Sequence, residues 1–484
     1  MPPRRAAILV LAAAAFGLVF QYLFVRERTG ANVVAATALF LALTWAFRDR
    51  GRHFAWRDAW LPLGALLFAA LCAIRTDALL VAFDALASVA LALGTVVASR
   101  GVPVSDLPLG RLIATGLAAC GALLSRMVMA CAVAIPALGA FAPGRASRMV
   151  GYGGGVVLAV PFLVVFAVLF SSADAVFQRT LADALDFVRW RELLADAPWR
   201  ATLATVAMWL AGGALAWLAE PPSTDRDTRP AGLVGADPVT AMLVAIDALF
   251  AFFVVVQIAY LFGGRDTVAA AGIAYSAYAR RGFFELVAVA TLVGGLLFSV
   301  DLVVRERGRA YRTAAILLVA LTAVVLASAA LRMALYQQAY GWTELRLYAC
   351  AATLYLALAL AVLAWAVARS RMEVALQRLV LAGIVVAIAT NAVGPSDLIA
   401  RANIERATSP ALPADVSRDL DVCYLVSLGD GAVPAIMRAL PSLPDGERTR
   451  TLELLRADAT RRPGPGGWQS WNLDRRRAEE VLPR

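Results

Sequence analysis

The stretch MLVAIDALFAFFVVVQIAYLFGG, residues 242–264, decides the fold class. It holds one acid and one glutamine in an apolar run that is long enough to cross the hydrocarbon core of a bilayer, which takes about 20 mostly apolar residues in a helix. The whole chain has 61% hydrophobic and 17% charged residues in 484, whereas a soluble protein would carry roughly a quarter charged residues. We therefore predict an all-α fold, a polytopic transmembrane helical bundle.

Apolar runs of spanning length recur along the chain, and they predict about 11 spans. The stretch 112–141 is ambiguous because it carries Arg126 near its middle, and a lone arginine at the bilayer centre costs roughly 2.5 kcal/mol or more. We treat this stretch as interfacial or re-entrant. The predicted spans cover approximately residues 6–25, 31–47, 58–75, 78–98, 151–171, 199–219, 239–262, 283–304, 313–332, 346–368 and 376–394.

The arginines predict how the spans are oriented. The chain contains no lysine, so its net charge of +10 comes from arginine. If 112–141 does not cross, the arginine-rich loops fall on one side, which the positive-inside rule identifies as the cytoplasm. We therefore expect a cytoplasmic N-terminus and a C-terminal part outside. The loops concerned are 48–57, 100–148, 305–312 and 369–378.

The composition changes at Pro395. We divide the chain there into a transmembrane helical domain, 1–394, and a small soluble helical C-terminal domain, 395–484. PSDLIARANIER (395–406) begins with proline and a Ser396 or Asp397 cap, as helices do.

Further helices are expected in the C-terminal domain. Two short ones are separated at Gly429–Gly431, another covers 446–462, and a last one is capped by Asn472 or Asp474. Apolar residues at helical spacing predict a packed core. They are Leu425, Leu428, Val433, Ile436 and Leu440.

Polar residues inside predicted spans are candidate functional residues, because each needs a partner within the bundle. Asp84, Asp247 and Gln257 are of this kind. A functional role and a purely structural interhelical hydrogen bond both stay open for them.

A second candidate is a polar cluster at the outer rim. In YSAYARRGFFELV (275–287), Arg281 and Glu285 lie one turn apart on one helix face, so they are expected to pair. Arg280 points elsewhere. Asp174 or Glu344 from neighbouring helix ends would complete the cluster, which is either functional or a membrane anchor.

A third candidate lies in the C-terminal domain, in the motif that contains Asp397, Arg401, Asn403 and Arg406. Asp397 and Arg401 are four residues apart, so local pairing within a helix also explains them.

Several chemistries are excluded. His53 is the chain's one histidine, and Cys423 is the one cysteine of the C-terminal domain. A His/Cys metal site or a Ser-His-Asp triad would lack partners. We expect no cofactor, no metal and no nucleic-acid partner, since the arginines fit a membrane-protein loop pattern.

Separate motifs resemble an uncharacterised family of multi-pass bacterial membrane proteins, known as a domain of unknown function. The resemblance runs from about residue 150 to the end and implies a bacterial inner (plasma) membrane location. It supplies no activity or catalytic residue. The motifs are LFSSADAVF (169–177), YLFGG (260–264), YSAYARRGFFELV (275–287), RMALYQQAYGWTELRLY (332–348), PSDLIARANIER (395–406), DLDVCYLVSLGDGAVPAI (419–436) and SWNLDRRRA (470–478).

Two functions compete. We favour a non-enzymatic transporter-like or envelope signalling and assembly component, with the lipid bilayer and unknown membrane or envelope proteins as partners. The alternative is a membrane glycosyl- or lipid-transferring enzyme with an outer-face acidic site. In this chain the first outer loop is too short to hold a sugar site, so acids of the 172–198 loop would have to act as the catalytic residues. These acids are Asp174, Asp183, Asp186, Glu192 and Asp196.

Overall fold

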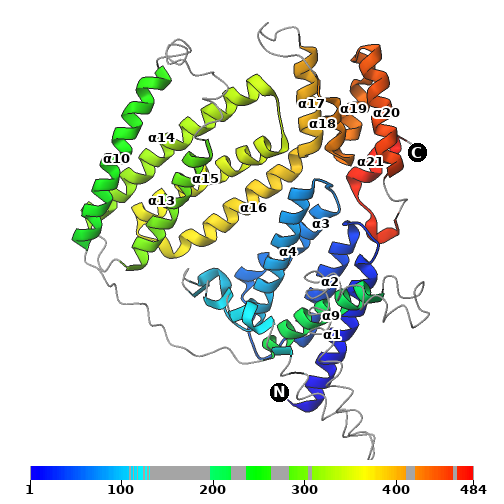
Figure 1. Ribbon diagram of the computed structural model, residues 1–484. Helices are drawn as coiled ribbons and strands as arrows, with labels where there is room; N and C mark the ends of the chain where they lie inside the picture. Colours follow the sequence, from blue (N-terminus) through cyan, green and yellow to red (C-terminus); the bar gives the residue numbers. More distant parts are fainter. Residues whose placement is uncertain are drawn as a thin grey trace, which may run out of the picture. The chain divides into compact units, whose positions relative to one another are not determined.

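The computed structural model describes most of the chain as helices joined by turns and short loops (Figure 1). No strand occurs in the described residues, so the all-α prediction is confirmed for them. Contacts divide the chain into two units. Unit 1 comprises Met1–Thr224 and Pro463–Arg476, and unit 2 comprises Asp225–Arg462 and Arg477–Arg484. The described residues are 2–107, most of 111–130, 197–219, 236–262, 283–303, 308–409, 420–461 and 466–482.

Unit 1 contains apolar helices that pack closely. α1 lies against α9, and Gly17 makes this possible because a Cβ there would lie 2.2 Å from the carbonyl oxygen of Ala204. Ser88 of α4 links its neighbours, since its hydroxyl donates to the Ala65 carbonyl of α3 at 2.9 Å and lies 3.2 Å from the Thr37 hydroxyl of α2. The described long helices of unit 1 are α1 (Pro3–Phe24), α2 (Ala31–Phe47), α3 (Trp60–Cys72), α4 (Ala78–Ser99) and α9 (Ala197–Leu218).

Unit 2 contains a second set of apolar helices with a continuous core. α14 contacts α10, α13 and α15, and Leu318 and Leu297 are fully buried between these helices. The helices of this set are α10 (Ala236–Phe262), α13 (Phe283–Val303), α14 (Arg309–Tyr340), α15 (Glu344–Arg369) and α16 (Ala375–Val393).

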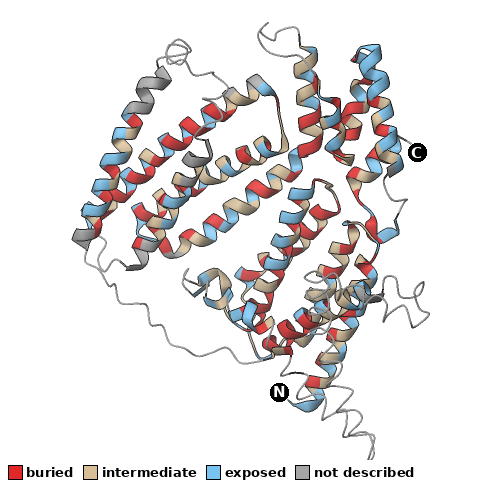
Figure 2. Ribbon diagram, viewed as in Figure 1, coloured by how far each residue is buried: buried red, intermediate tan, exposed pale blue. Residues whose placement is uncertain are grey.

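Many large apolar residues on these helices are exposed, and Figure 2 colours exposed residues pale blue along the helices. Leu86, Phe252 and Leu292 are 72%, 69% and 72% exposed. Extended exposed apolar surface of this kind suits lipid rather than water. Six described helices are long and apolar enough to cross a membrane, which supports a helical membrane protein. The predicted number of spans stays a prediction, and the stretches 131–141 and 151–171 lie outside the described residues.

The predicted helices of the C-terminal part are present, and they lie in unit 2 except for the first turn of α21, which belongs to unit 1. They share a core with the start of α15, in which Ile399, Leu425 and Ile436 pack with Leu347. All five apolar residues predicted for this core are buried. The helices are α17 (Pro395–Thr408), α18 (Val422–Ser427), α19 (Val433–Ala439), α20 (Asp445–Arg461) and α21 (Leu473–Val481).

One predicted helix start is wrong in detail. Neither Ser396 nor Asp397 caps α17, because Gly394, with φ +70°, ends α16 and places Pro395 directly at the first position of the next helix. The Ser396 hydroxyl instead donates to the Leu428 carbonyl oxygen at 3.0 Å, which ties α17 to the end of α18.

Candidate functional site

The most extensive polar arrangement in unit 1 involves residues 466–476, here called the C-terminal strap. The strap runs along the α1–α2 and α3–α4 loops (Figure 1). Backbone bonds fix its register: the Leu473 and Asp474 amides donate to the carbonyls of Ala73 and Ile74 at 2.9 and 3.1 Å. On the other loop, the Ala31 amide donates to the Trp471 carbonyl at 3.0 Å. The strap therefore joins two helical hairpins, α1–α2 and α3–α4. These hairpins follow each other in the sequence, whereas the strap lies near the other end of the chain.

Asn472 is the central side chain of the strap. Its Nδ2 donates to the carbonyl oxygens of Cys72 and Arg75 at 3.2 and 2.8 Å. Its Oδ1 accepts the Arg475 amide at 3.2 Å, so it also caps α21. The Asn472 side chain is 2% exposed. The prediction that Asn472 or Asp474 caps the last helix is confirmed for Asn472, and the structure adds that the same side chain binds the α3–α4 loop.

Charged groups complete the strap. Arg75 and Asp474 form an ion pair at 3.3 Å with side chains only 13% and 6% exposed. On the α1–α2 loop, the Glu27 carboxylate accepts the Ser470 hydroxyl and, at 3.3 Å, the Gly467 amide. Partial burial strengthens such charge-assisted hydrogen bonds relative to exposed ones.

Gly30 allows the close approach of the strap. A Cβ at this position would lie 2.4 Å from the Trp471 carbonyl oxygen. Asn32, which is fully buried, orders the same loop: its Nδ2 donates to the Leu23 and Arg28 carbonyls, and its Oδ1 accepts the Gly30 amide at 2.8 Å.

A second coupling lies in unit 2, between the α14–α15 loop and α17. Asn403 makes two reciprocal bonds with the backbone of Trp342: its Oδ1 accepts the amide at 2.7 Å, and its Nδ2 donates to the carbonyl at 2.8 Å. Gly341 ends α14 with a φ of +74°, a backbone conformation that favours glycine. A Cβ on Gly341 would lie 2.5 Å from Asn403 Oδ1 and 3.3 Å from Arg406 Nη1, so both motif residues face this turn.

Arg346 closes the same turn from α15. Its guanidinium donates to the carbonyls of Tyr340 and Gly341 and stacks on the Tyr336 ring, 4.2 Å from the centroid. Glu344 contributes its amide, which donates to the Tyr424 hydroxyl of α18 at 2.9 Å. Burial raises the pKa of Tyr424, which stays protonated at neutral pH.

The remaining motif residues of α17 form a surface group. Asp397 pairs with Arg401 one turn later and with Arg438 of α19 at 3.2 Å. The two arginines are 52% and 64% exposed, so these pairs contribute little to stability.

The predicted outer-rim cluster lies largely outside the described residues, so it stays a prediction. Asp174, Arg280 and Arg281 lie outside them, and for Glu285 and Gln257 only the helix backbone is described. Within spans, Asp84 and Asp247 are buried, at 0% and 4% exposure. Both carboxylate oxygens of Asp247 have no hydrogen-bond partner among the described residues.

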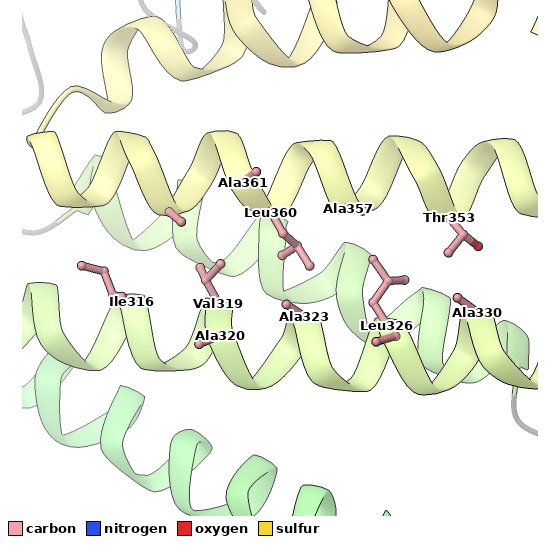
Figure 3. Close-up of a pocket in the computed structure, with 12 residues that line it drawn as sticks. Ile316, Val319, Ala320, Ala323, Leu326, Ala330, Thr353, Ala357, Leu360 and Ala361 are labelled. Carbon is pink, nitrogen blue, oxygen red and sulfur yellow. The ribbon is translucent and has the colours of Figure 1, made fainter. Parts of the chain in front are cut away.

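The pocket between α14 and α15 offers little chemistry (Figure 3). It has a volume of about 410 Å³ and apolar walls. Its polar lining residue, Thr353, donates its hydroxyl to the Ala349 carbonyl at 2.8 Å. Among the described residues, no group of three or more His, Cys, Asp or Glu side chains is placed to hold a metal ion.

Sequence reasoning missed Glu27, Arg75 and Arg346. A signal existed for Arg75, because the predicted topology puts it at the outer end of the span 58–75, where the positive-inside rule disfavours arginine. For Arg346 the signal was the glycine turn YGWT between two helices with aromatic residues spaced one turn apart before it.

Gly341→Ala is expected to destabilise the protein more than Gly429→Ala. Both glycines have positive φ, at +74° and +81°, where an L residue costs about 1–2 kcal/mol. Only at Gly341 would the new Cβ also strike a neighbour, Asn403, whereas the space around Gly429 is open. Thermal unfolding of the full chain in detergent micelles measures the difference. Equal losses in Tm would show that Asn403 does not pack against the turn.

No curated protein and no solved structure matches the chain. One protein family does match, over residues 63–439, and it is described as Domain of unknown function (DUF4153). The match includes the α3–α4 loop, the α14–α15 loop and α17, but not the strap. It confirms the resemblance to an uncharacterised family that the sequence motifs indicated. Because the match covers more than half of its length, the chain belongs to this family.

Proposed function

We propose that this chain is a non-enzymatic component of the bacterial inner membrane that acts in envelope assembly or signalling, with the C-terminal domain as its outer part. One observation carries the proposal. The polar side chains of its motifs, above all Asn403 and Asn472, bind backbone groups of loops between apolar helices. Within each unit such bonds hold a segment of the C-terminal part against a loop between apolar helices, as a component that relays or holds a position requires.

The same bonds support a topology. Hydrogen-bonded segments must lie on one face of the membrane, since the hydrocarbon core is about 30 Å thick. The strap, the α1–α2 loop and the α3–α4 loop therefore share a face, so an even number of crossings separates the α3–α4 loop from the strap. The assignment of about 11 spans satisfies this condition, and counting 112–141 as a further span violates it. The positive-inside rule makes the shared face the outer one.

Alkaline phosphatase fused after Arg484 is expected to be active, and a fluorescent protein at the same place to be dark. Phosphatase fused after a truncation at Arg28 is expected to be active as well, because the α1–α2 loop shares the face of the strap. A fluorescent C-terminal fusion together with an active Arg28 fusion would contradict the topology.

A transporter-like role is the second candidate, and Asp247 favours it. Intramembrane acids are rare and often belong to ion or proton pathways. Asp247 is buried in α10 without a hydrogen-bond partner among the described residues. The enzyme alternative depends on Asp174 and its loop.

Complementation of a deletion strain under envelope stress separates these functions. We expect the Asn403→Ala, Asn472→Ala double variant to fail, because both couplings are broken. The Asp84→Asn, Asp247→Asn double variant and Asp174→Ala are expected to complement. Arg477→Ala, an exposed change beside the strap, is the control, and membrane levels are matched by immunoblot.

The opposite pattern would contradict the proposal. Failure of the aspartate double variant with normal activity of the asparagine variant indicates transport through a midplane site. Failure of Asp174→Ala alone indicates an outer-face enzyme.

A further inference from the structure

A polar-rimmed cavity of unit 1 lies between α2, α3 and the end of α4. Its volume is about 960 Å³, at the upper end of the range for small-molecule sites. One wall is apolar and formed by Leu41, Leu63 and Leu66 of α2 and α3. The opposite rim belongs to the α2–α3 loop and carries Arg48, Arg50 and Arg52. The cavity is therefore apolar along the helices and basic at its loop end.

The basic rim is incompletely neutralised. Arg52 pairs with Asp49 at 3.4 Å and donates to the Leu218 carbonyl at 3.1 Å. Arg48 stacks on Trp45, with 4.1 Å between the guanidinium carbon and the ring centroid. Arg50 is exposed. In the described part of the chain neither Arg48 nor Arg50 forms an ion pair, so these two side chains keep the rim positively charged.

A buried hydroxyl gives an independent indication of a ligand. Ser99, at the end of α4, lines the cavity and is 1% exposed. Its Oγ has no hydrogen-bond partner among the described residues. The other hydroxyls of the lining are used within their own helices, since Thr44 and Thr95 donate to the carbonyls of Phe40 and Leu91. A buried hydroxyl without a partner is unfavourable unless a bound group completes it.

The cavity also lies where a helix leaves the hydrocarbon. α2 ends at Phe47, and the aromatic residues Trp45 and Trp56 at the rim are 61% and 89% exposed. Exposed tryptophans beside arginines are typical of the membrane interface. A ligand that fits must therefore carry an anionic group at interface depth and an apolar chain below it.

We propose that this cavity binds an anionic phospholipid. Its phosphate lies against Arg48 and Arg50, a headgroup or ester oxygen accepts the Ser99 hydroxyl, and one acyl chain follows the leucine wall. Basic pockets between membrane helices recognise lipid headgroups through the same chemistry.

Native mass spectrometry of the full chain, released from detergent micelles, tests the proposal. Phosphatidylglycerol and phosphatidylcholine with the same acyl chains are added in turn. Wild type is expected to retain phosphatidylglycerol at least about tenfold more strongly, from the attraction of an anionic headgroup by two arginines. Arg48→Gln with Arg50→Gln should remove this preference, and Ser99→Ala should weaken retention without lowering Tm.

The matched control removes two exposed arginines elsewhere, Arg309→Gln with Arg371→Gln, and should leave retention unchanged. Equal retention of the two lipids by wild type would overturn the proposal, as would a preference that survives Arg48→Gln with Arg50→Gln. Displacement of phosphatidylglycerol by millimolar inorganic phosphate would show a soluble-anion site and overturn the lipid assignment.

Discussion

The hydrogen bonds of Asn472 link the strap to the α3–α4 loop of unit 1. Its side chain donates to the carbonyl of Cys72, the last residue of α3, and to that of Arg75 in the following loop, and it accepts the Arg475 amide in the first turn of α21. Those carbonyls lie where a short helix ends, and helix ends leave such groups without partners. The strap supplies the partners, and in return the loop fixes the register of the strap through the amides of Leu473 and Asp474.

The second coupling follows the same principle in unit 2. Gly341 ends α14 with a positive φ, and the backbone of Trp342 then presents an amide and a carbonyl that Asn403 binds together. An asparagine side chain suits this role because it carries one donor and one acceptor side by side. Each of the two asparagines thus holds part of the C-terminal region against a loop between apolar helices.

Much of this fold was predictable because its signals are local. Runs of apolar residues predicted the long helices, and helical spacing predicted the buried positions of Leu425 and Ile436. The start of α17 was misassigned because Gly394 and Pro395 together made a side-chain cap unnecessary. α3 covers 13 residues, fewer than the predicted run, because its apolar sequence continues into the turn that binds the strap.

The candidate site was less predictable because its bonds join residues far apart in the sequence, 61 positions for Asn403 and Trp342 and 400 for Asn472 and Cys72. Asp397 and Arg401 pair within one helix, as spacing indicated, yet this pair is exposed and minor. Asn403 belongs to a predicted candidate motif. It binds the backbone of Trp342, however, and no pattern of residue types identifies a backbone partner. Arg75 and Asp474 form a partly buried ion pair that only the fold brings together.

Hydrogen exchange at single amides, measured on the full chain in lipid nanodiscs, tests the central claim that the strap is held to the α3–α4 loop. The amides of Leu473 and Asp474 should be protected in wild type and in Arg477→Ala. In Asn472→Ala they should exchange roughly 30-fold faster, since leaving buried carbonyls without partners costs about 2 kcal/mol. Exchange of these amides at unstructured-chain rates in wild type, with α1 and α4 still protected, would contradict the account.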